Sequence, residues 1–447
     1  MSPASAALNP AIWPNSAARL ASGELQIASM SVIDLADQYA TPLYVYDADE
    51  IYARALQMKA AFDQQPLNCD VHYASKAFLS KAVAKIINQA GLHLDVASGG
   101  ELTIALAAKF PAANIAFHGN NKSDAEIELA ISSGVGHIVI DSLHEIKRVA
   151  AIAEKYKVQQ AVMLRATLGI DAHTHEFIST AHEDQKFGLS AADGSLEKAV
   201  ELLVQHDALQ LIGLHSHIGS QILAIDGFAA AAAKLVAQTA ELNQKFGLKM
   251  STVGLGGGFG IAYVDSDKPV AIEAIAKLLN DTVIAQSKKV GLDVAKITVE
   301  PGRFIVGPPG ITLYTVGTVK PVTVTAGVTR AYISVDGGMS DNIRTALYDA
   351  HYTAVLANRS STAPLVLSRI VGKHCESGDI VVRDCQLPAD IAPGDLIAVA
   401  ATGAYCRSMA SQYNGTPRPA VVGITAGQAG IWIRRETYED LLALDQG

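Results

Sequence analysis

The sequence predicts an α/β protein, with a (β/α)8 barrel of the TIM type and a mostly antiparallel β domain. Two observations support this prediction. From about residue 70 to residue 302, eight short apolar and β-branched runs alternate with longer amphipathic stretches. After about residue 311 the runs become short and β-rich, with turn residues between them. Strands that are buried on both faces and alternate with helices form parallel sheets, and eight such units over ~250 residues are enough to close a barrel.

The eight strand-like runs of the barrel are rich in Val, Ile and Leu. They cover 70–75, 92–98, 114–119, 137–141, 161–167, 211–217, 252–258 and 297–302. Helical patterns lie between them, for example at 80–91, 123–134 and 226–242. Ser123 stands where an N-cap belongs, and Gly134 where a helix ends. An open doubly wound sheet is the alternative, but no GxGxxG motif follows the first strand.

The β domain is predicted from both ends of the chain. Its C-terminal runs are 311–319, 330–338, 365–375, 379–384 and 396–405. Turn signals such as Pro393-Gly394-Asp395 separate them. The N-terminal segment also contains regular patterns, at 31–39 and 42–47, that are free to pair with these strands. We therefore expect a barrel domain at 47–311 and a β domain made of 1–46 and 312–447.

Composition excludes several classes of protein. Of 447 residues, 49% are hydrophobic and 18% charged, which is typical of a globular chain. The net charge is −9 and no run of Lys or Arg occurs, so nucleic acid and anionic membrane surfaces are poor partners. The four Cys form no CxxC pattern, which argues against a disulfide scaffold or a zinc ribbon. Neither a secretory signal nor an apolar span of ~18 residues is found, so we expect a cytoplasmic protein.

The predicted barrel carries polar residues, or glycines able to bind a ligand through their backbone, at nearly every strand end. They are Lys76, Asp95, His118, Asp141, Arg165, His217, Gly256 to Gly258 and Glu300. Barrel enzymes build their active sites at the C-terminal ends of the strands. Solvated loops would not place a functional group at nearly all of these ends, so the pattern indicates catalysis.

Lys76 and the glycine cluster together suggest a cofactor. Lys76 ends a buried strand, where desolvation would favour a neutral amine able to form a Schiff base. Gly256, Gly257 and Gly258 follow the seventh strand, where barrels often bind phosphate through backbone N–H groups. A lysine paired with a carboxylate and a simple tight turn are the structural alternatives. The combination predicts a phosphorylated aldehyde, pyridoxal phosphate.

Glu300 and the histidines extend this hypothesis. Glu300 ends the eighth strand, where a carboxylate can keep a cofactor's pyridine nitrogen protonated. The alternative for Glu300 is an ion pair with Arg303. His215 and His217 share one face of the sixth strand and could be packed histidines or a metal pair. Hydrolases with an HxH metal pair carry it on the first strand, so we expect no metal.

At this point the motifs resemble a known family. Those of the barrel are 73–78, 95–102, 118–123, 215–221, 254–260 and 299–303, and those that follow are 336–348, 372–379 and 403–406. From about Asn9 to Asp440 the chain resembles the fold-type III pyridoxal phosphate-dependent decarboxylases, whose barrel is like that of alanine racemase. The last three motifs are similar to the branch of the family that acts on diaminopimelate. The resemblance implies a β-sandwich-like second domain and a homodimer with shared active sites.

The resemblance also implies a role for each site residue. Cofactor binding is implied for Lys76 (Schiff base), His217 (stacked on the pyridine), Ser220 with Gly256, Gly257 and Gly258 (phosphate), Glu300 (pyridine nitrogen), and Asp95, Gly302, Arg303 and Tyr405. Substrate binding is implied for Arg303, Arg344 and Tyr348 (distal carboxylate), Glu376 (distal ammonium) and Tyr405. Cys375, supplied by the partner subunit, is implied to donate the proton. Lys76, His217 and Cys375 form the expected catalytic set.

The implied reaction is decarboxylation of meso-2,6-diaminopimelate to L-lysine and CO2, the last step of lysine biosynthesis. Arg344 and Tyr348 are four residues apart, and a guanidinium suits the second carboxylate that ornithine lacks. Two features depart from the family pattern. Many relatives have Arg-Pro where this chain has Arg344-Thr345, and the long segment 169–190 contains three His. We interpret that segment as a lid, with a metal cluster as the alternative.

Three other functions remain open from the sequence. An ornithine- or arginine-type decarboxylase of the same fold is the nearest alternative. An amino-acid racemase of related fold is less favoured, because the segment around Cys375 would have no catalytic role in it. A non-catalytic cofactor-binding homologue is disfavoured, because such proteins usually lose the lysine or the cysteine and both Lys76 and Cys375 are present.

Overall fold

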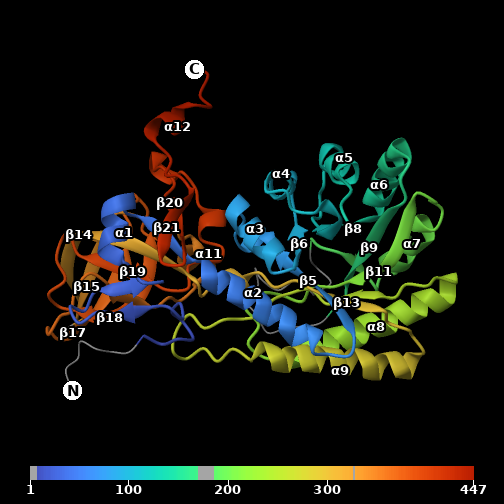
Figure 1. Ribbon diagram of the computed structural model, residues 1–447, viewed down its shortest axis with the longest axis horizontal. Coiled ribbons are helices and arrows are strands. Elements are labelled where there is room, and N and C mark those ends of the chain that lie inside the picture. Colours follow the sequence, from blue (N-terminus) through green and yellow to red (C-terminus); the bar gives the residue numbers. More distant parts are fainter. Residues whose placement is uncertain (1–7, 170–185, 326–327) are drawn as a thin grey trace. The chain divides into compact units, whose positions relative to one another are not determined.

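The computed structural model describes residues 8–169, 186–325 and 328–447 (Figure 1). The chain divides into two compact units. The barrel unit comprises Arg54–Gly260 and Pro269–Gly302. The β unit comprises Met1–Ala53, Ile261–Lys268 and Arg303–Gly447. No helix among the described residues combines the length and the apolar character needed to cross a membrane.

The barrel unit contains a closed parallel barrel. Its eight strands are β5 (Asn68–Ala74), β6 (His93–Val96), β7 (Ile115–Phe117), β8 (His137–Ile140), β9 (Gln160–Thr167), β11 (Leu209–His215), β12 (Thr252–Gly254) and β13 (Lys296–Val299). They pair in sequence order, and β13 also pairs with β5, so the sheet has no free edge. A two-residue strand, β10 (Leu189–Ser190), adds to β9. The prediction of a barrel is confirmed, and the open-sheet alternative is wrong.

Helices connect the barrel strands. They are α3 (Lys81–Gln89), α4 (Gly99–Ala107), α5 (Asp124–Ser133), α6 (Leu143–Tyr156), α7 (Ser195–Leu203), α8 (Asp226–Phe246) and α9 (Ile272–Val290). The ends of α5 confirm the sequence signals. Ser123 and Glu126 form a capping box at its N-terminus, and Gly134 adopts a left-handed conformation (φ 75°) at its C-terminus. The N-cap fixes where the βα turn between β7 and α5 ends, and this turn carries His118 of the candidate site.

The β unit is a largely antiparallel sheet that includes the N-terminal segment (Figure 1). Its strands after the barrel are β14 (Gly310–Thr325), β15 (Val328–Val335), β16 (Ala354–Leu356), β17 (Leu365–Val371), β18 (Ile380–Pro388), β19 (Leu396–Val399), β20 (Ala420–Thr425) and β21 (Gln428–Ile433). Strand β4 (Leu43–Asp47) lies between β14 and β20. The prediction that the N-terminal segment joins the later β domain is therefore confirmed.

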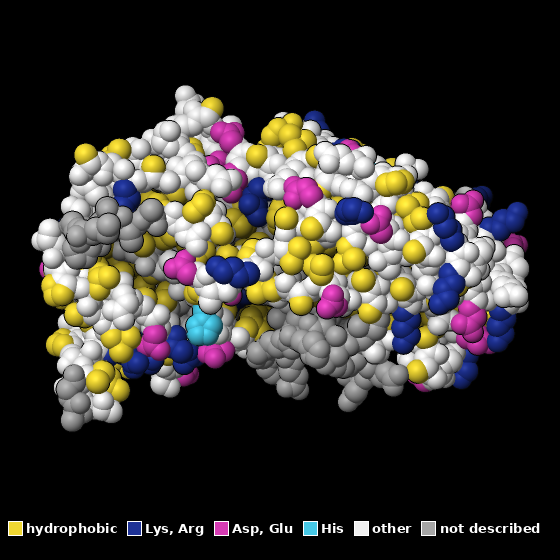
Figure 2. All heavy atoms as spheres, turned by 90° about the horizontal axis from the view of Figure 1, so that it is seen from below, with side chains coloured by type: hydrophobic (Ala, Val, Ile, Leu, Met, Phe, Trp, Pro, Cys, Tyr) yellow, Lys and Arg dark blue, Asp and Glu magenta, His cyan; other side chains and the backbone are white. Residues whose placement is uncertain are grey.

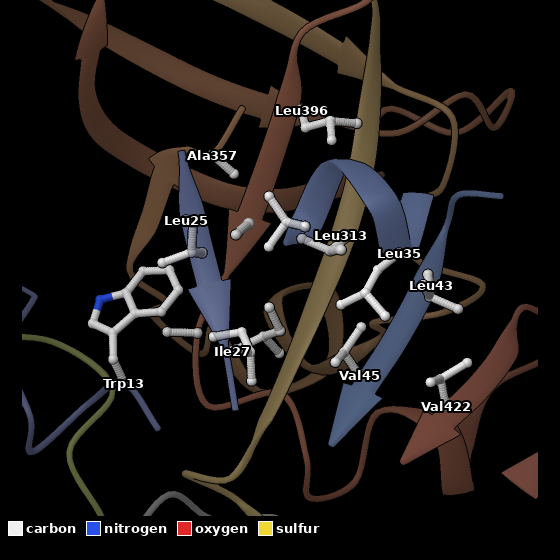
Figure 3. Close-up of a cluster of buried hydrophobic side chains, with 14 of the residues drawn as sticks. Trp13, Leu25, Ile27, Leu35, Leu43, Val45, Leu313, Ala357, Leu396 and Val422 are labelled. Carbon is white, nitrogen blue, oxygen red and sulfur yellow. The ribbon is translucent and has the colours of Figure 1, made fainter. Parts of the chain in front are cut away.

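One hydrophobic core explains why the N-terminal segment belongs to the β unit. Trp13, Leu25 and Ile27 pack with side chains from the sheet, among them Leu313 and Leu396 (Figure 3). These side chains are 7% exposed or less. Burying a large apolar side chain contributes ~1.5–3 kcal/mol, so the segment contributes substantially to the stability of this unit.

The surface carries both signs of charge. On the face drawn in Figure 2, Lys and Arg side chains are interspersed with Asp and Glu among the described residues. This pattern accords with a net charge of −9 that serves solubility.

Candidate active site

Four buried residues meet at the C-terminal ends of the barrel strands. Asp95 lies in β6, His118 follows β7, His215 ends β11 and Glu300 follows β13. Each is 9% exposed or less. Nε2 of His215 lies 2.8 Å from Oε1 of Glu300, and Nε2 of His118 lies 3.4 Å from the same oxygen. Nε2 of His118 is also 3.7 Å from Oδ1 of Asp95. Three of the strand-end residues named from the sequence, Asp95, His118 and Glu300, thus form one cluster with His215.

The environment separates the two carboxyl groups. Burial alone would raise the pKa of Glu300, but His215 and His118 hold that pKa well below its usual range. Burial and the nearby charge of Glu300 raise the pKa of Asp95 well above its usual range. The two pKa values are therefore moved apart: Glu300 is the more acidic group and is ionised at neutral pH, whereas Asp95 holds its proton more tightly. Such a division between neighbouring carboxyl groups is typical of active sites.

His217 is held in one neutral form. The backbone N–H of Gly257 donates to its Nδ1 over 3.1 Å, so the ring proton lies on Nε2. Burial, and then the positive charge of Lys76, lower the pKa of His217 well below its usual value. A neutral, fixed imidazole is suited to stacking against a flat ring.

The turn after β12, Gly256 to Gly258, has a backbone conformation and close contacts that only glycine allows. Gly256 and Gly258 have φ of +67° and +102°. A Cβ on Gly257 would lie 2.0 Å from the carbonyl oxygen of Glu300, and one on Gly258 would lie 2.3 Å from that of Gly219. Gly219 belongs to the loop after β11, and the residue that follows it in this loop is Ser220. The turn and this loop therefore approach each other closely, as in a phosphate-binding cradle.

The structure corrects one expectation about Lys76. It stands in a short 3₁₀ turn, Ser75–Ala77, and it is exposed whereas both of its neighbours are buried. The expected desolvation by burial is wrong, because the strand ends at Ala74 and the turn carries the side chain out of the buried layer. Gly302 packs against this turn, since a Cβ there would lie 3.0 Å from Cβ of Ala77.

A buried ion pair that the sequence did not reveal supports two further strand ends. Nζ of Lys122 donates to Oε1 of Glu145 over 2.6 Å and to the carbonyl of Val139 over 2.7 Å. The other oxygen of Glu145 accepts from the backbone N–H of Asp141. Oδ2 of Asp141 lies 3.8 Å from Nη1 of Arg165. The HGNNKS motif contained the lysine, but its partner lies 23 residues away on α6.

Two arginines in the β unit are held by tyrosines. Arg303 opens α10 (Arg303–Val306), and its Nη1 donates to the hydroxyl of Tyr263 over 2.5 Å. Nη1 of Arg344 donates to the hydroxyl of Tyr352, also over 2.5 Å. The guanidinium of Arg344 lies 4.8 Å from the ring centre of Tyr263, and that of Arg303 lies 4.7 Å from Tyr405. Arg303, Arg344 and Tyr405 are thus brought together around Tyr263.

The sequence reasoning missed Tyr263, Tyr352 and Cys406. The two tyrosine rings meet edge to face with their centres 5.2 Å apart. The hydroxyl of Tyr352 lies 3.6 Å from Sγ of Cys406, whose pKa is raised to about 11 by burial. This thiol is protonated and serves packing. The sequence does place Tyr352 near Arg344 and Tyr263 near the glycine cluster. Only the folded structure shows which arginine each tyrosine contacts.

Arg344 and Tyr348 lie on one short helix, α11 (Arg344–Tyr348). The helix forms without the proline that many relatives carry at position 345. The hydroxyl of Thr345 instead donates to the carbonyl of Val381 over 2.8 Å and anchors the first turn. Arg344 is 5% exposed, and Tyr348 is partly exposed.

Cys375 and Glu376 lie elsewhere in the β unit. Both are exposed on the turn between β17 and β18. The backbone N–H of Cys375 donates to Oδ1 of Asn414, and Oε1 of Glu376 accepts from Ser377 and Gly378. Within the part of the chain that the structure describes, these contacts do not reach Arg303 or Arg344.

Two metal hypotheses can be compared with the structure. His217 pairs with Gly257, whereas His215 lies with His118 and Glu300, whose possible ligand atoms are within 4.8 Å of one another. Any metal would therefore use this trio and not the HxH pair. Residues 170–185 of the expected lid, with their three His, lie outside the described residues.

Comparison with known proteins gives consistent results. The pyridoxal binding domain of the pyridoxal-dependent decarboxylases matches residues 48–307. The diaminopimelate decarboxylase of Mycobacterium tuberculosis is 53% identical over 98% of both chains, and that of Bacillus subtilis is 46% identical over 95% of both.

Solved structures agree with these relatives. The diaminopimelate decarboxylase of M. jannaschii in complex with L-lysine has a TM-score of 0.88, with 29% identity over 97% of this chain and 98% of that one. The Helicobacter pylori enzyme with L-lysine has a TM-score of 0.83, with 30% identity over 93% of this chain and 99% of that one.

Proposed function

The chain belongs to the diaminopimelate decarboxylase family of pyridoxal-dependent decarboxylases, and we propose that it converts meso-2,6-diaminopimelate to L-lysine and CO2. Full-length identities of 53% and 46% support this activity. The observation that carries the substrate assignment is Arg344. It is 5% exposed, and no carboxylate among the described residues forms an ion pair with it. A buried guanidinium without an acidic partner is costly, and the distal carboxylate of diaminopimelate would neutralise it.

Pyridoxal phosphate fits the barrel residues. The turn at Gly256, Gly257 and Gly258, with Ser220 in the facing loop, is suited to its phosphate. Ionised Glu300 is suited to its pyridine nitrogen, and neutral His217 to its ring face. When bound, the cofactor would supply the electron sink for the electron pair that the departing CO2 leaves on Cα.

The other cofactor-binding roles complete the proposal. Lys76 binds the cofactor's aldehyde, and its exposed side chain is accessible for this reaction. Gly302 allows the turn of Lys76 to approach closely. Burial and the charge of Glu300 raise the pKa of Asp95, which favours the protonated form that donates a hydrogen bond and adds no second negative charge beside Glu300. Arg303 and Tyr405 stack on each other and complete the cofactor set.

Substrate is bound and protonated by residues of the β unit. Arg303, Arg344 and Tyr348 bind the distal carboxylate, Glu376 binds the distal ammonium, and Tyr405 contacts the substrate. Loss of CO2 leaves an electron pair at Cα that must take up one proton, and Cys375 delivers it. Cys375 and Glu376 act in the site of the partner subunit of a homodimer. Their exposure, and contacts that do not reach the arginines of the described part of their own subunit, support this arrangement.

The remaining assignments belong to the same proposal. The functional domains are a barrel domain at 47–311 and a β domain of 1–46 with 312–447. This division differs from the compact units, because it assigns 47–53, 261–268 and 303–311 to the barrel domain. The enzyme works in the cytoplasm, where an exposed catalytic thiol stays reduced.

An assay of CO2 release tests the function. The purified protein is given meso-diaminopimelate, ornithine or arginine, with and without added pyridoxal phosphate. We expect turnover of diaminopimelate alone, stimulated by the cofactor. Turnover of ornithine or arginine would assign the chain to that type of decarboxylase instead. Absence of turnover with every substrate, together with no cofactor binding, would leave a non-catalytic homologue.

A further inference from the structure

We infer that His215 and His118 are positioning residues for Glu300: their imidazoles bind one carboxylate oxygen, Oε1, and leave Oε2 to the bound cofactor. This inference rests on the proposed role of Glu300 at the pyridine nitrogen. It assigns a function to two histidines that neither touch the reacting atoms nor take part in the mechanism above.

The geometry is convergent. His215 ends β11 and His118 follows β7, on opposite sides of β13 and Glu300 in the barrel order. Their Nε2 atoms lie 2.8 Å and 3.4 Å from the same oxygen, Oε1. The rings meet at 72° with centres 4.9 Å apart, so each limits the rotation of the other. Among the described residues, no hydrogen bond or ion pair is formed by Oε2 of Glu300.

Charge explains why imidazole is the suitable partner. Burial first lowers the pKa of His118 well below its usual value, so this ring is neutral. A neutral imidazole at this distance can lie beside the ionised carboxylate without cancelling its charge. A buried Lys or Arg at the same place would form a salt bridge and weaken the attraction of Glu300 for a protonated pyridine nitrogen.

His118 also connects the two carboxyl groups. Its Nε2 lies between Oε1 of Glu300 and Oδ1 of Asp95, at 3.4 Å and 3.7 Å. Because the pKa of Asp95 is raised and that of Glu300 is lowered, the negative charge of the two carboxyl groups is concentrated on Glu300. That charge is fixed in place before the cofactor arrives, which is the preorganisation that electrostatic catalysis requires.

The test compares variants of His215 in the full-length apoprotein. His215→Leu removes the donor, and His215→Gln restores an N–H at similar reach. His93→Leu is the matched control, because His93 is a half-buried histidine of the neighbouring barrel strand β6 that faces Asp70 and not Glu300. Glu300→Gln provides the reference for loss of the carboxylate. The readouts are the dissociation constant for pyridoxal phosphate and the absorbance spectrum of the bound cofactor.

We expect His215→Leu to weaken cofactor binding on the order of tenfold and to shift the spectrum in the same direction as Glu300→Gln. His215→Gln should recover most of both effects, and His93→Leu should match the wild type. If His215→Leu fails to fold, as judged by its melting temperature, His118→Leu and His118→Gln are compared in the same way.

Two results would overturn the inference. The first is a His215→Leu protein with wild-type affinity and spectrum while Glu300→Gln is altered. The second is a stoichiometric metal ion in the purified wild type that His215→Leu abolishes, because Glu300 would then be a metal ligand. Failure of the proposed function itself looks different: the wild type would not bind pyridoxal phosphate, or Glu300→Gln would change nothing.

Discussion

The backbone N–H of Gly257 donates a hydrogen bond to Nδ1 of His217 over 3.1 Å. The bond joins the glycine turn after β12 to the loop after β11. It also means that one of the three glycine N–H groups orients a histidine, which leaves those of Gly256 and Gly258 for a phosphate. Because the carbonyl of Gly256 accepts from the N–H of Glu300 over 2.9 Å, the turn, the histidine and the glutamate are positioned together.

Replacing Gly257 should disrupt all three parts at once. A Cβ in Gly257→Ala would lie 2.0 Å from the carbonyl oxygen of Glu300, so the backbone must move. Overpacking of this kind costs ~1–3 kcal/mol, and we expect pyridoxal phosphate to bind roughly ten- to a hundredfold more weakly. Titration of the apoprotein measures this. Gly430→Ala is the control, because no atom lies within 4 Å of its new Cβ. Equal affinities for the two variants would contradict the prediction.

Lys76→Ala should abolish the absorbance that arises when a lysine binds the cofactor's aldehyde. The reason is that Ala has no amine, while the glycine turn and Glu300 are unchanged. Absorbance spectra of the purified protein with added pyridoxal phosphate measure the effect. Lys81→Ala removes another exposed lysine, on α3, and should keep the wild-type spectrum. A persistent lysine-type band in Lys76→Ala would assign the role to a different residue.

Arg344→Lys should raise the KM for diaminopimelate at least about tenfold, with a smaller change in kcat. An ammonium lacks the planar fork that binds a carboxylate through two hydrogen bonds, and it would lose the hydroxyl of Tyr352. Steady-state kinetics separate the two constants. The control is Arg434→Lys, an exposed arginine paired with Asp440. An unchanged KM would remove Arg344 from substrate recognition.

Mixing two inactive variants tests whether Cys375 acts across subunits. Neither Lys76→Ala nor Cys375→Ala should turn over substrate at the wild-type rate. Random exchange of subunits gives half heterodimers, each with one intact site of two, so activity should return to roughly a quarter of the wild-type value. Rates of CO2 release before and after mixing measure this. No recovery in a mixture shown to exchange would mean that Lys76 and Cys375 serve a site from the same subunit. Cys385→Ala should be active without mixing, because that half-buried thiol lies on β18 and contacts the carbonyl of Ser368.

Acid should destabilise the barrel through its buried histidines. Burial, then His137 and His93, lower the pKa of His72 to about 3. An unfolded His titrates near ~6.5, so between these values the unfolded chain binds more protons than the folded one. Stability therefore falls by about 1.4 kcal/mol per pH unit, for this group, as pH drops below ~6.5.

The variant His72→Asn should make that fall shallower by about one proton. Urea unfolding monitored by far-UV circular dichroism at about pH 5 and pH 7 measures the slope. His144→Asn should leave it unchanged, because His144 is exposed on α6. Equal slopes for His72→Asn and the wild type would show that His72 does not remain neutral in the fold.

The sequence by itself determined the fold class and most of the site. Alternation of apolar runs and amphipathic stretches identified the eight barrel strands, because strands buried on both faces must be apolar and helices must have one apolar face. The rule that barrel sites lie at strand ends then selected Lys76, His217 and Glu300. Local caps such as Ser123 also followed, since a cap depends only on neighbouring residues.

Only the tertiary structure decided which side chains meet. Glu145 lies 23 residues after Lys122, Tyr352 supports Arg344, and His118 shares an oxygen of Glu300 with His215. These pairings depend on how strands and helices are placed in space, which no spacing along the chain encodes. The exposure of Lys76 was likewise decided by a 3₁₀ turn of three residues. Sequence patterns identify residues that are capable of chemistry, whereas distances and burial show which partners they meet and which charge they carry.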